Sequence, residues 1–249
     1  IDPPFFSGRN YNVIWGDTNE VRSFFDVWEG GMDSYLVWLN ARLWEMRRIL
    51  KKTGSLYVHC DWHASHYIKT EMDKIFGYEN FRNEVVWSYN STNRPPNDFG
   101  RKHDVVLRYS KKSDYYFDSP REPYADTVFS GRFGKDEQGY FNVVNGKKYY
   151  IHPEGRRVGD VWDLGIIGQR SYERIGYPTQ KPEALLERII KASSNEGDVV
   201  ADFFCGGGTT LAVAQKLKRR FIGCDSSRVA ISVTLDRLVK VGEEMSGVK

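Results

Sequence analysis

The sequence predicts an α/β protein that carries an inserted, mostly β or irregular region, and three observations support this fold class. Near the beginning of the chain, stretches with a helical apolar period alternate with short β-rich runs. The same alternation returns near the end. Between these two regions, over residues 91–176, the helical period disappears. A chain of 249 residues is long enough for one large domain or for a domain with an inserted module.

The first region, residues 1–90, reads as helix, strand, helix, strand. Apolar residues at spacings of three and four predict a helix over 34–52 that Gly54 ends: Leu36, Leu39, Leu43, Met46 and Leu50. SLYVHC at 55–60 predicts a strand. A second helical face precedes Gly77 and contains Ile68, Met72, Ile75 and Phe76. NEVVWSY at 83–89 predicts another strand, so the order is typical of a doubly wound sheet.

Residues 91–176 read as turns and short strands rich in Tyr, Gly, Arg and Lys. The clearest element is a hairpin over 140–151, in which Asn145 and Gly146 supply the two positive-φ positions of a tight turn. The α/β order resumes in residues 177–249. There we expect a helix after Pro182, a strand over 199–204, a glycine turn, a helix from Thr209 and a strand over 220–224.

Composition limits the classes of protein that the chain can represent. The net charge is +3 and the pI is about 8.6, so an acidic partner must be met by a local basic patch. The three cysteines, Cys60, Cys205 and Cys224, have no C-x-x-C spacing, which disfavours a disulfide framework and a thiolate zinc site and favours a reducing, cytoplasmic setting. No apolar run predicts a membrane span. Because the chain does not begin with Met, we expect N-terminal sequence to be missing.

A glycine run between a predicted strand and a predicted helix indicates a ligand-binding turn. Gly206, Gly207 and Gly208 let the backbone approach a ligand closely and direct free amides at it. Asp202 precedes the run, and Asp225 ends the next strand, where a carboxylate can accept both hydroxyls of a ribose. Together they suggest a nucleoside cofactor. A dinucleotide fingerprint would place a third glycine at position 211, which is Leu211.

The stretch IDPPFF at the start of the chain predicts a rigid, extended turn. Pro3 and Pro4 fix φ at two consecutive positions and remove two backbone donors. The turn would hold Asp2 and Phe5 in a set relation. Taken alone, D-P-P is more often a frayed terminus or a loop, so a partner motif must decide between these interpretations.

Three motifs in order provide that partner. DPPF at 2–5, YPTQKPEALLERII at 177–190 and DFFCGGGTT at 202–210 resemble the β-class of DNA amino-methyltransferases, which use S-adenosylmethionine. The resemblance covers essentially the whole chain. It implies a Rossmann-like methyltransferase sheet with circularly permuted motif order. It also implies a catalytic half over 1–90, a target-recognition and DNA-contact region over 91–176, and a cofactor-binding half over 177–249.

The resemblance also implies site residues. Those expected around the cofactor are Asp202, Phe204, Cys205, Gly206, Gly208, Thr209, Asp225, Thr179 and Lys181. Among them Asp225 would hold the ribose, and Thr179 and Lys181 would lie near the methionine end. Phe203 and Gly207 depart from the usual Pro and Ser of the family, so contacts from these two positions transfer least.

For catalysis the resemblance implies that the D-P-P-F turn, Asp2, Pro3, Pro4 and Phe5, activates an exocyclic amino group. The Asp2 carboxylate and the Pro3 carbonyl would accept the two amino hydrogens and direct the nitrogen lone pair at the methyl group. Phe5 would stack on a base flipped out of the duplex. Asp at the first motif position favours adenine N6 over cytosine N4. The alternatives are a nucleotide-dependent oxidoreductase and a catalytically silent DNA-binding module that keeps the cofactor fold.

The segment 91–112 has six basic residues against two acidic ones and follows the catalytic half. A solvated basic loop would explain the charge alone. Its position favours contact with the phosphates of double-stranded DNA, and the expected residues are Arg94, Arg101, Lys102 and Arg108, with Lys147 and Lys148 as further candidates. The resemblance also allows a homodimer and a cognate restriction endonuclease as partners.

The stretch HCDWHASH at 59–66 concentrates potential metal ligands. His63 and His66 could share a helix face, but the spacing fits no common closed site, so we expect no metal there. In the family this strand end lines the floor of the active site, so Asp61 is expected near substrate or cofactor.

Overall fold

The computed structural model describes residues 1–14, 20–89, 95–124 and 133–247. The chain divides into two compact units. One contains Ile1–Phe117 and Asp160–Lys249, and the other contains Asp118–Gly159. Among the described helices, none is long and apolar enough to cross a membrane.

A four-stranded sheet organises the first half of the larger unit. Its strands are β3 (Ser55–Cys60), β4 (Phe81–Ser88), β5 (His103–Ser110) and β11 (Val161–Asp163), in the order β11-β4-β5-β3. β5 is antiparallel to both β3 and β4, whereas β11 is parallel to β4. A hairpin of β1 (Asn10–Ile14) and β2 (Glu20–Phe25) precedes this sheet and was not predicted.

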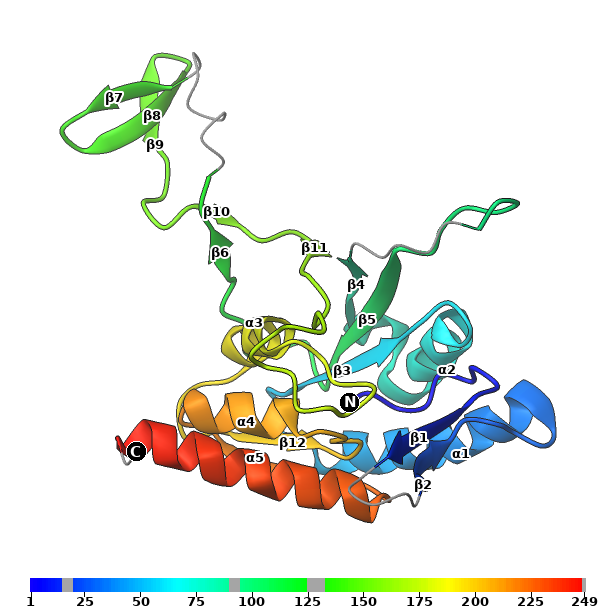
Figure 1. The fold of residues 1–249 in the computed structure, drawn as a ribbon. Helices are drawn as coiled ribbons and strands as arrows, with labels where there is room; N and C mark the ends of the chain where they lie inside the picture. The colour runs from blue at the N-terminus through cyan, green and yellow to red at the C-terminus, as the bar shows by residue number, and fades with distance from the viewer. Residues whose placement is uncertain (15–19, 90–94, 125–132, 248–249) are drawn as a thin grey trace. The chain divides into compact units, whose positions relative to one another are not determined.

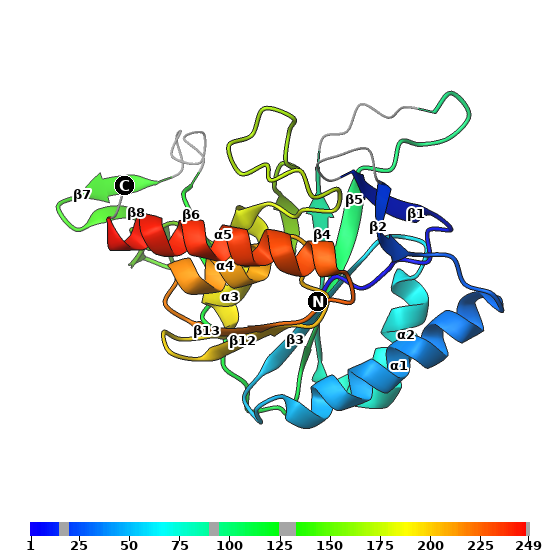
Figure 2. The same ribbon diagram turned by 60° about the horizontal axis from the view of Figure 1, so that its bottom comes forward.

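Two helices supply the other half of this core. Helices α1 (Gly31–Ile49) and α2 (Ser65–Phe76) lie side by side, as both ribbon views show (Figures 1 and 2). Leu39 and Leu43 of α1 and Ile68 of α2 are fully buried with Val58 and Leu107 of the sheet. A 3-10 turn, η1 (Tyr78–Asn80), leads from α2 into β4. The predicted elements over 34–89 are therefore confirmed, with ends shifted by a few residues.

The second half of the larger unit is built from α3 (Glu183–Ser193), β12 (Val199–Asp202), α4 (Thr209–Lys216), β13 (Arg220–Gly223) and α5 (Arg228–Ser246). β12 and β13 are parallel neighbours, and in the described part of the chain they pair only with each other. The strands that were expected in a doubly wound sheet thus form two separate sheets, β11-β4-β5-β3 and β12-β13. α4 and α5 run side by side (Figures 1 and 2). The α/β class is confirmed, although α5 was not predicted.

The first residue of the chain is bound to the edge of β3. The Ile1 amino group donates to the Tyr57 carbonyl at 2.8 Å, and the Ile1 carbonyl accepts from the His59 amide at 3.0 Å. This pairing places the D-P-P-F turn at the end of β3, beside His59.

The smaller unit contains the predicted hairpin. β8 (Gly139–Val144) and β9 (Lys147–Tyr150) pair across Asn145 and Gly146, whose φ values are +48° and +75°, and β7 (Gly134–Asp136) completes a three-stranded sheet. β6 (Arg121–Glu122) and β10 (Arg156–Arg157) form a separate pair. Lys148 forms an ion pair with Asp136 at 2.6 Å.

The smaller unit is narrower than the inserted region expected over 91–176. β5 and β11 lie within that range, yet both belong to the main sheet. The apolar run Val105, Val106, Leu107 is buried, and Val105 and Leu107 pack against α1 and α2. A continuous apolar run is the signature of a buried strand, but the charged residues around it made the segment resemble a loop.

Candidate active site

Asp26 fixes the D-P-P-F turn. Its buried carboxylate accepts hydrogen bonds from three consecutive backbone amides, those of Phe5 (3.2 Å), Phe6 (2.9 Å) and Ser7 (2.6 Å). The Trp28 indole donates to the same carboxylate at 3.1 Å. Phe6 is in the left-handed region at φ +65°, a conformation that residues other than glycine seldom adopt. A single buried anion therefore determines the path of the backbone after the second proline.

Tyr35 of α1 holds the turn from the other side. Its hydroxyl donates to the Pro4 carbonyl at 2.6 Å, and its ring packs edge-on against Trp28 at 5.2 Å. Burial, followed by the nearby acidic groups, raises the pKa of Tyr35 well above its ordinary value, so the phenol remains a donor. The turn is consequently rigid because of its prolines and because of partners on both sides.

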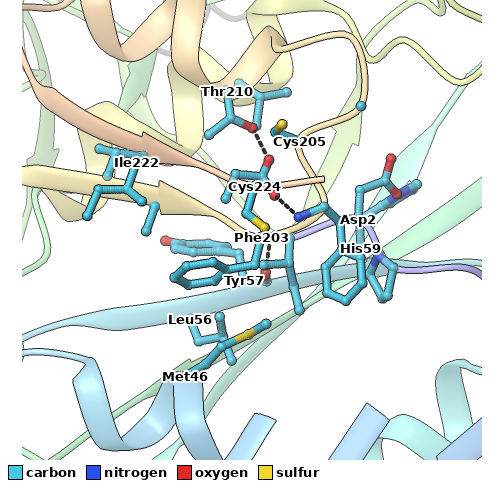
Figure 3. Close-up of a pocket in the computed structure, with 18 of the residues that line it drawn as sticks. Asp2, Met46, Leu56, Tyr57, His59, Phe203, Cys205, Thr210, Ile222 and Cys224 are labelled. Carbon is cyan, nitrogen blue, oxygen red and sulfur yellow. Dashed lines mark hydrogen bonds and ion pairs between the residues drawn. The ribbon is translucent and has the colours of Figure 1, made fainter. Parts of the chain in front are cut away.

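The Asp2 carboxylate joins the two halves of the larger unit. Its Oδ1 lies 2.7 Å from His59 Nδ1 at the end of β3, and its Oδ2 accepts from Lys181 Nζ at 2.6 Å. Burial acts to raise the pKa of Asp2, but the charges of Lys181 and His59 outweigh it and hold that pKa far below its usual range. Figure 3 shows Asp2 and His59 next to each other at one end of the pocket. Asp2 is therefore an anion at neutral pH.

His59 itself lies between two carboxylates. Its Nε2 is 3.2 Å from Asp104 Oδ2 on β5, and the other Asp104 oxygen accepts from the Tyr89 hydroxyl at 3.0 Å. Burial acts to lower the pKa of His59, but the Asp2 charge and the hydrogen bonds to Asp104 and Asp2 raise it. The Phe5 ring meets the imidazole edge-on at 5.1 Å.

The glycine turn follows β12. Asp202 accepts from the Phe204 amide at 3.1 Å and from the Thr210 hydroxyl at 2.6 Å, the latter drawn in Figure 3. Asp225 accepts from the Gly206 amide at 2.9 Å and from the Ser227 amide at 2.9 Å. Both acids predicted to face a ligand thus also hold the turn in place.

The glycines of this turn face different neighbours. A Cβ on Gly206 would lie 3.2 Å from the Tyr177 ring, and a Cβ on Gly207 would lie 2.9 Å from the Ile175 side chain. Gly208 begins α4 at φ +73°, and a Cβ there would lie 2.6 Å from the Thr234 hydroxyl on α5. Gly208 is required for close packing of α4 on α5. It is not among the residues that line the pocket, and its contact with a cofactor stays a prediction.

A cavity of about 1730 Å³ connects the D-P-P-F turn with the glycine turn. Among its lining residues are eleven more of those predicted: Pro3, Pro4, Phe5, Thr179, Lys181, Asp202, Phe204, Cys205, Gly206, Thr209 and Asp225, in addition to Asp2. Pockets for cofactor-sized ligands usually occupy 300–1,000 Å³, so this cavity has room for two ligands side by side. Burial raises the pKa of the Cys205 thiol to about 12, so this side chain lines the cavity as an uncharged thiol.

The residues predicted to contact DNA differ in exposure. Arg101 is exposed, and its guanidinium lies over the Trp62 ring at 4.2 Å from the ring centroid. Lys102 is half-buried, and Arg94 lies outside the described residues. The prediction for Arg108 is wrong. Its side chain is 3% exposed on β5, with the guanidinium 3.9 Å from the centroid of Phe117, because β5 is a buried strand and not a loop.

The potential metal ligands at 59–66 form other contacts. Asp61 accepts from the His63 amide at 2.9 Å and pairs with the His63 ring at 2.8 Å, which begins the turn into α2. Within the described ranges, no group of three or more His, Cys, Asp or Glu residues is arranged to hold a metal ion.

Sequence reasoning missed the residues that support the site. Asp26 and Tyr35 have no motif around them. His59 belongs to the strand end that the resemblance places at the floor of the active site, but the sequence does not indicate its contacts with Asp2 and Asp104. Asp104 was counted only as a negative charge in a basic segment.

Comparison with known proteins matches this arrangement to one family. Residues 1–236 match a family model described as DNA methylase. The DNA adenine methyltransferase YhdJ of Escherichia coli (strain K12) is 31% identical over 239 residues, covering 95% of this chain and 74% of that protein. The type II methyltransferase M.HpaI of Haemophilus parainfluenzae is 30% identical over 240 residues, covering 95% of this chain and 66% of that protein.

Among solved structures, the crystal structure of the M1.HpyAVI–SAM complex resembles this fold. The TM-score is 0.54 at 22% sequence identity, and the match covers 81% of this chain and 82% of that chain. At this level of identity the match supports the fold alone.

Proposed function

Because this chain belongs to the DNA methylase family, we propose that it transfers a methyl group from S-adenosylmethionine to the exocyclic N6 of adenine in DNA. The observation that carries the proposal is the Asp2–Lys181 ion pair at 2.6 Å. It joins the rigid D-P-P-F turn to the loop before α3, and the Lys181 carbonyl accepts from the hydroxyl of Thr209, next to the glycine turn, at 3.2 Å. Both turns line one cavity. A base and a cofactor bound there would be adjacent.

The cavity suits S-adenosylmethionine. The turn at Gly206 and Gly207 passes close to Tyr177 and Ile175, which leaves little room for a side chain, and Asp225 lines the cavity with acceptor capacity for ribose hydroxyls. Thr179 and Lys181 line the same cavity, and Lys181 contacts both Asp2 and Thr209. When bound, S-adenosylmethionine supplies an electrophilic methyl group whose bond to sulfur breaks with the electron pair left on sulfur.

The target amino group is a poor nucleophile because its lone pair is delocalised into the ring. The Asp2 carboxylate and the Pro3 carbonyl accept its two hydrogens and draw the nitrogen towards tetrahedral geometry. Tyr35 already occupies the Pro4 carbonyl, which favours Pro3 for this role. After a nitrogen–carbon bond forms, the nitrogen loses a proton along its hydrogen bond to Asp2, and the proton passes to water.

Phe5 offers a face for the extruded base. Its ring is kept in place by edge-on contact with His59 at 5.1 Å and by the Lys181 ammonium at 5.6 Å from the ring centroid. A target nitrogen inside a base stack is out of reach, so the base must leave the duplex and stack on such a ring.

The proposed DNA surface lies around Arg101. Phe99 is 93% exposed two residues before it, and Trp62, half exposed, lies under the Arg101 guanidinium. Basic groups that contact phosphates, interleaved with exposed aromatic rings, are typical of nucleic-acid surfaces. We assign target recognition to the region 91–176, with Arg101 and Lys102 as phosphate contacts and Lys147 as a further candidate in the smaller unit.

In the decisive experiment, DNA is incubated with the protein and tritium-labelled S-adenosylmethionine, and the base that carries the label is identified. Asp2→Ala is the control. We expect label in N6-methyladenine and none with the control. Label in N4-methylcytosine would contradict the adenine assignment, and the absence of label from the parental protein would favour the catalytically silent DNA-binding module.

The proposal includes three statements about context. A cognate restriction endonuclease is proposed as a partner, because M.HpaI is named a type II methyltransferase. A homodimer is tested by light scattering over a range of protein concentrations. The three cysteines are free thiols, which supports a reducing, cytoplasmic setting.

A further inference from the structure

The methyl-transfer step described above gives His59 no part, yet His59 has a defined environment. The residue is 6% exposed, and each ring nitrogen faces a carboxylate oxygen, Asp2 at 2.7 Å and Asp104 at 3.2 Å. Antiparallel pairing of β3 with β5 fixes this arrangement, because Cys60 pairs with Val105, the neighbour of Asp104.

The hydrogen-bonding capacity of imidazole then defines its charge. A neutral ring has one donor and one acceptor nitrogen, whereas an ionised carboxylate only accepts. Both contacts of the ring with ionised carboxylates are hydrogen bonds only if both ring nitrogens carry hydrogen. The cluster of Asp2, Asp104, His59 and Lys181 then contains two negative and two positive charges, which balance in a buried site.

All groups around the ring are accounted for in the described structure. Asp2 and Lys181 face it from the turn and from the loop before α3, and Asp104 and Tyr89 face it from β5 and from the end of β4. The rings of Phe5 and Trp87 cover it at 5.1 Å and 5.5 Å. Asp104 is itself anchored by the Tyr89 hydroxyl, so the chain of contacts runs from Tyr89 to Asp2.

We propose that the His59 imidazolium, anchored by Asp104 and Tyr89, is a positioning residue for methyl transfer that fixes the orientation of the Asp2 carboxylate. The inference rests on the proposed function. Lys181 alone could hold Asp2 at one oxygen, but the carboxylate could still rotate about its bond to Cβ. A second charged contact at the other oxygen stops that rotation and leaves the remaining lone pairs of Asp2 directed at the amino group.

Misplacement of a catalytic group by about 1 Å can lower a rate by about a hundredfold. We therefore expect Asp104→Asn to lower the single-turnover methyl-transfer rate by about ten- to a hundredfold, with the dissociation constant for S-adenosylmethionine unchanged within about threefold. The alkaline limb of the pH–rate profile should also move to lower pH, because removing an anionic neighbour makes His59 lose its proton more easily.

Asp73→Asn is the matched control. Asp73 also accepts from a tyrosine hydroxyl, that of Tyr109 at 2.6 Å, and pairs with a cation, Lys69 at 2.8 Å, but it lies on α2 and does not line the cavity. We expect Asp73→Asn to lose about as much stability as Asp104→Asn without moving the alkaline limb of the pH–rate profile. If Asp104→Asn keeps the parental rate and pH limb, or if Asp73→Asn shifts the limb equally, the positioning role is refuted.

A second measurement does not depend on turnover. Nitrogen-15 chemical shifts of the His59 ring, assigned with His59→Gln, should show both nitrogens protonated at pH 7.5 in the parental protein and one deprotonated in Asp104→Asn. A neutral His59 ring in the parental protein would overturn the inference. A parental protein with a charged His59 and no methyl transfer would instead refute the proposed function, so the two failures are distinguishable.

Discussion

At the scale of single residues, Asp26 shows how much of the site depends on one buried carboxylate. It accepts hydrogen bonds from three consecutive amides at the end of the D-P-P-F turn and from an indole. Asp26→Ala leaves these donors unsatisfied, so we expect a loss of about 2–3 kcal/mol in the free energy of unfolding. Urea denaturation measures this change, and a loss below about 0.5 kcal/mol would show that Asp26 does not determine the turn.

Asp225 holds the glycine turn in place and is proposed to bind the cofactor ribose. It accepts hydrogen bonds from the Gly206 and Ser227 amides and lines the cavity. Asp225→Ala should weaken S-adenosylmethionine binding by about 1.5–3 kcal/mol, the range for hydrogen bonds to a charged group. The exposed Asp236 on α5 provides the control. Calorimetry that gives equal affinities for Asp225→Ala and Asp236→Ala would contradict the role of Asp225.

The cluster around Asp2 also predicts how stability depends on pH. The lowered pKa of Asp2 means that its ion pairs stabilise the fold above the unfolded value of about 3.8, and this is lost as the pH falls through the lowered pKa. The raised pKa of His59 means that its contribution is present below the unfolded value of about 6.5 and is lost as the pH rises through the raised pKa. The stability gap between the parental protein and Asp2→Asn should therefore be widest between about pH 4 and 6.5. A gap that is constant from pH 3 to 10 would contradict this.

At the scale of elements, a buried ion pair ties α3, α4 and α5 together beneath the glycine turn. Arg237 of α5 pairs with Glu183 of α3 at 2.9 Å and donates to the Gly207 carbonyl and the Thr209 hydroxyl. Arg237→Met would leave Glu183 paired only with Lys216. We expect about 3 kcal/mol of destabilisation, at the lower end for breaking a buried pair because Glu183 is partly exposed. An unchanged urea midpoint would show that these helices pack without the pair.

Element type could be predicted wherever apolar spacing was regular. The spacing of Leu39 and Leu43 predicted the helix that is α1. Val58 lies in β3, whose predicted bounds match the structure. β5 could not be separated from the basic segment around it, because the burial of Arg108 depends on aromatic partners such as Phe117 that no local pattern reveals. For the same reason the contacts of His59 with Asp2 and Asp104, at sequence separations of 57 and 45, were out of reach.

At the scale of the whole molecule, the motif order of the sequence predicted which distant segments meet. Asp2 and Lys181 are 179 positions apart and form an ion pair. What motif order could not supply was the extent of the smaller unit, because the strands that flank it, β5 and β11, belong to the main sheet.

The salt dependence of DNA binding tests whether Arg101 and Lys102 contact DNA phosphates. Replacing both with Ala should weaken binding to all duplex sequences alike and reduce the slope of log affinity against log salt by roughly one to two units. Fluorescence anisotropy at several salt concentrations measures this. A loss confined to one sequence context would mean that the pair reads bases.

Whether Asp2 acts on chemistry or on binding is tested most directly by single-turnover methyl transfer to a duplex that contains the target site. Base extrusion is followed at the same time by 2-aminopurine fluorescence. For Asp2→Ala we expect the transfer rate to fall by several orders of magnitude while S-adenosylmethionine and DNA still bind. Phe5→Ala should instead weaken base capture as well as turnover, because stacking worth about 1–3 kcal/mol forms once the base is extruded. An Asp2→Ala protein that transfers methyl groups at near the parental rate would contradict the account.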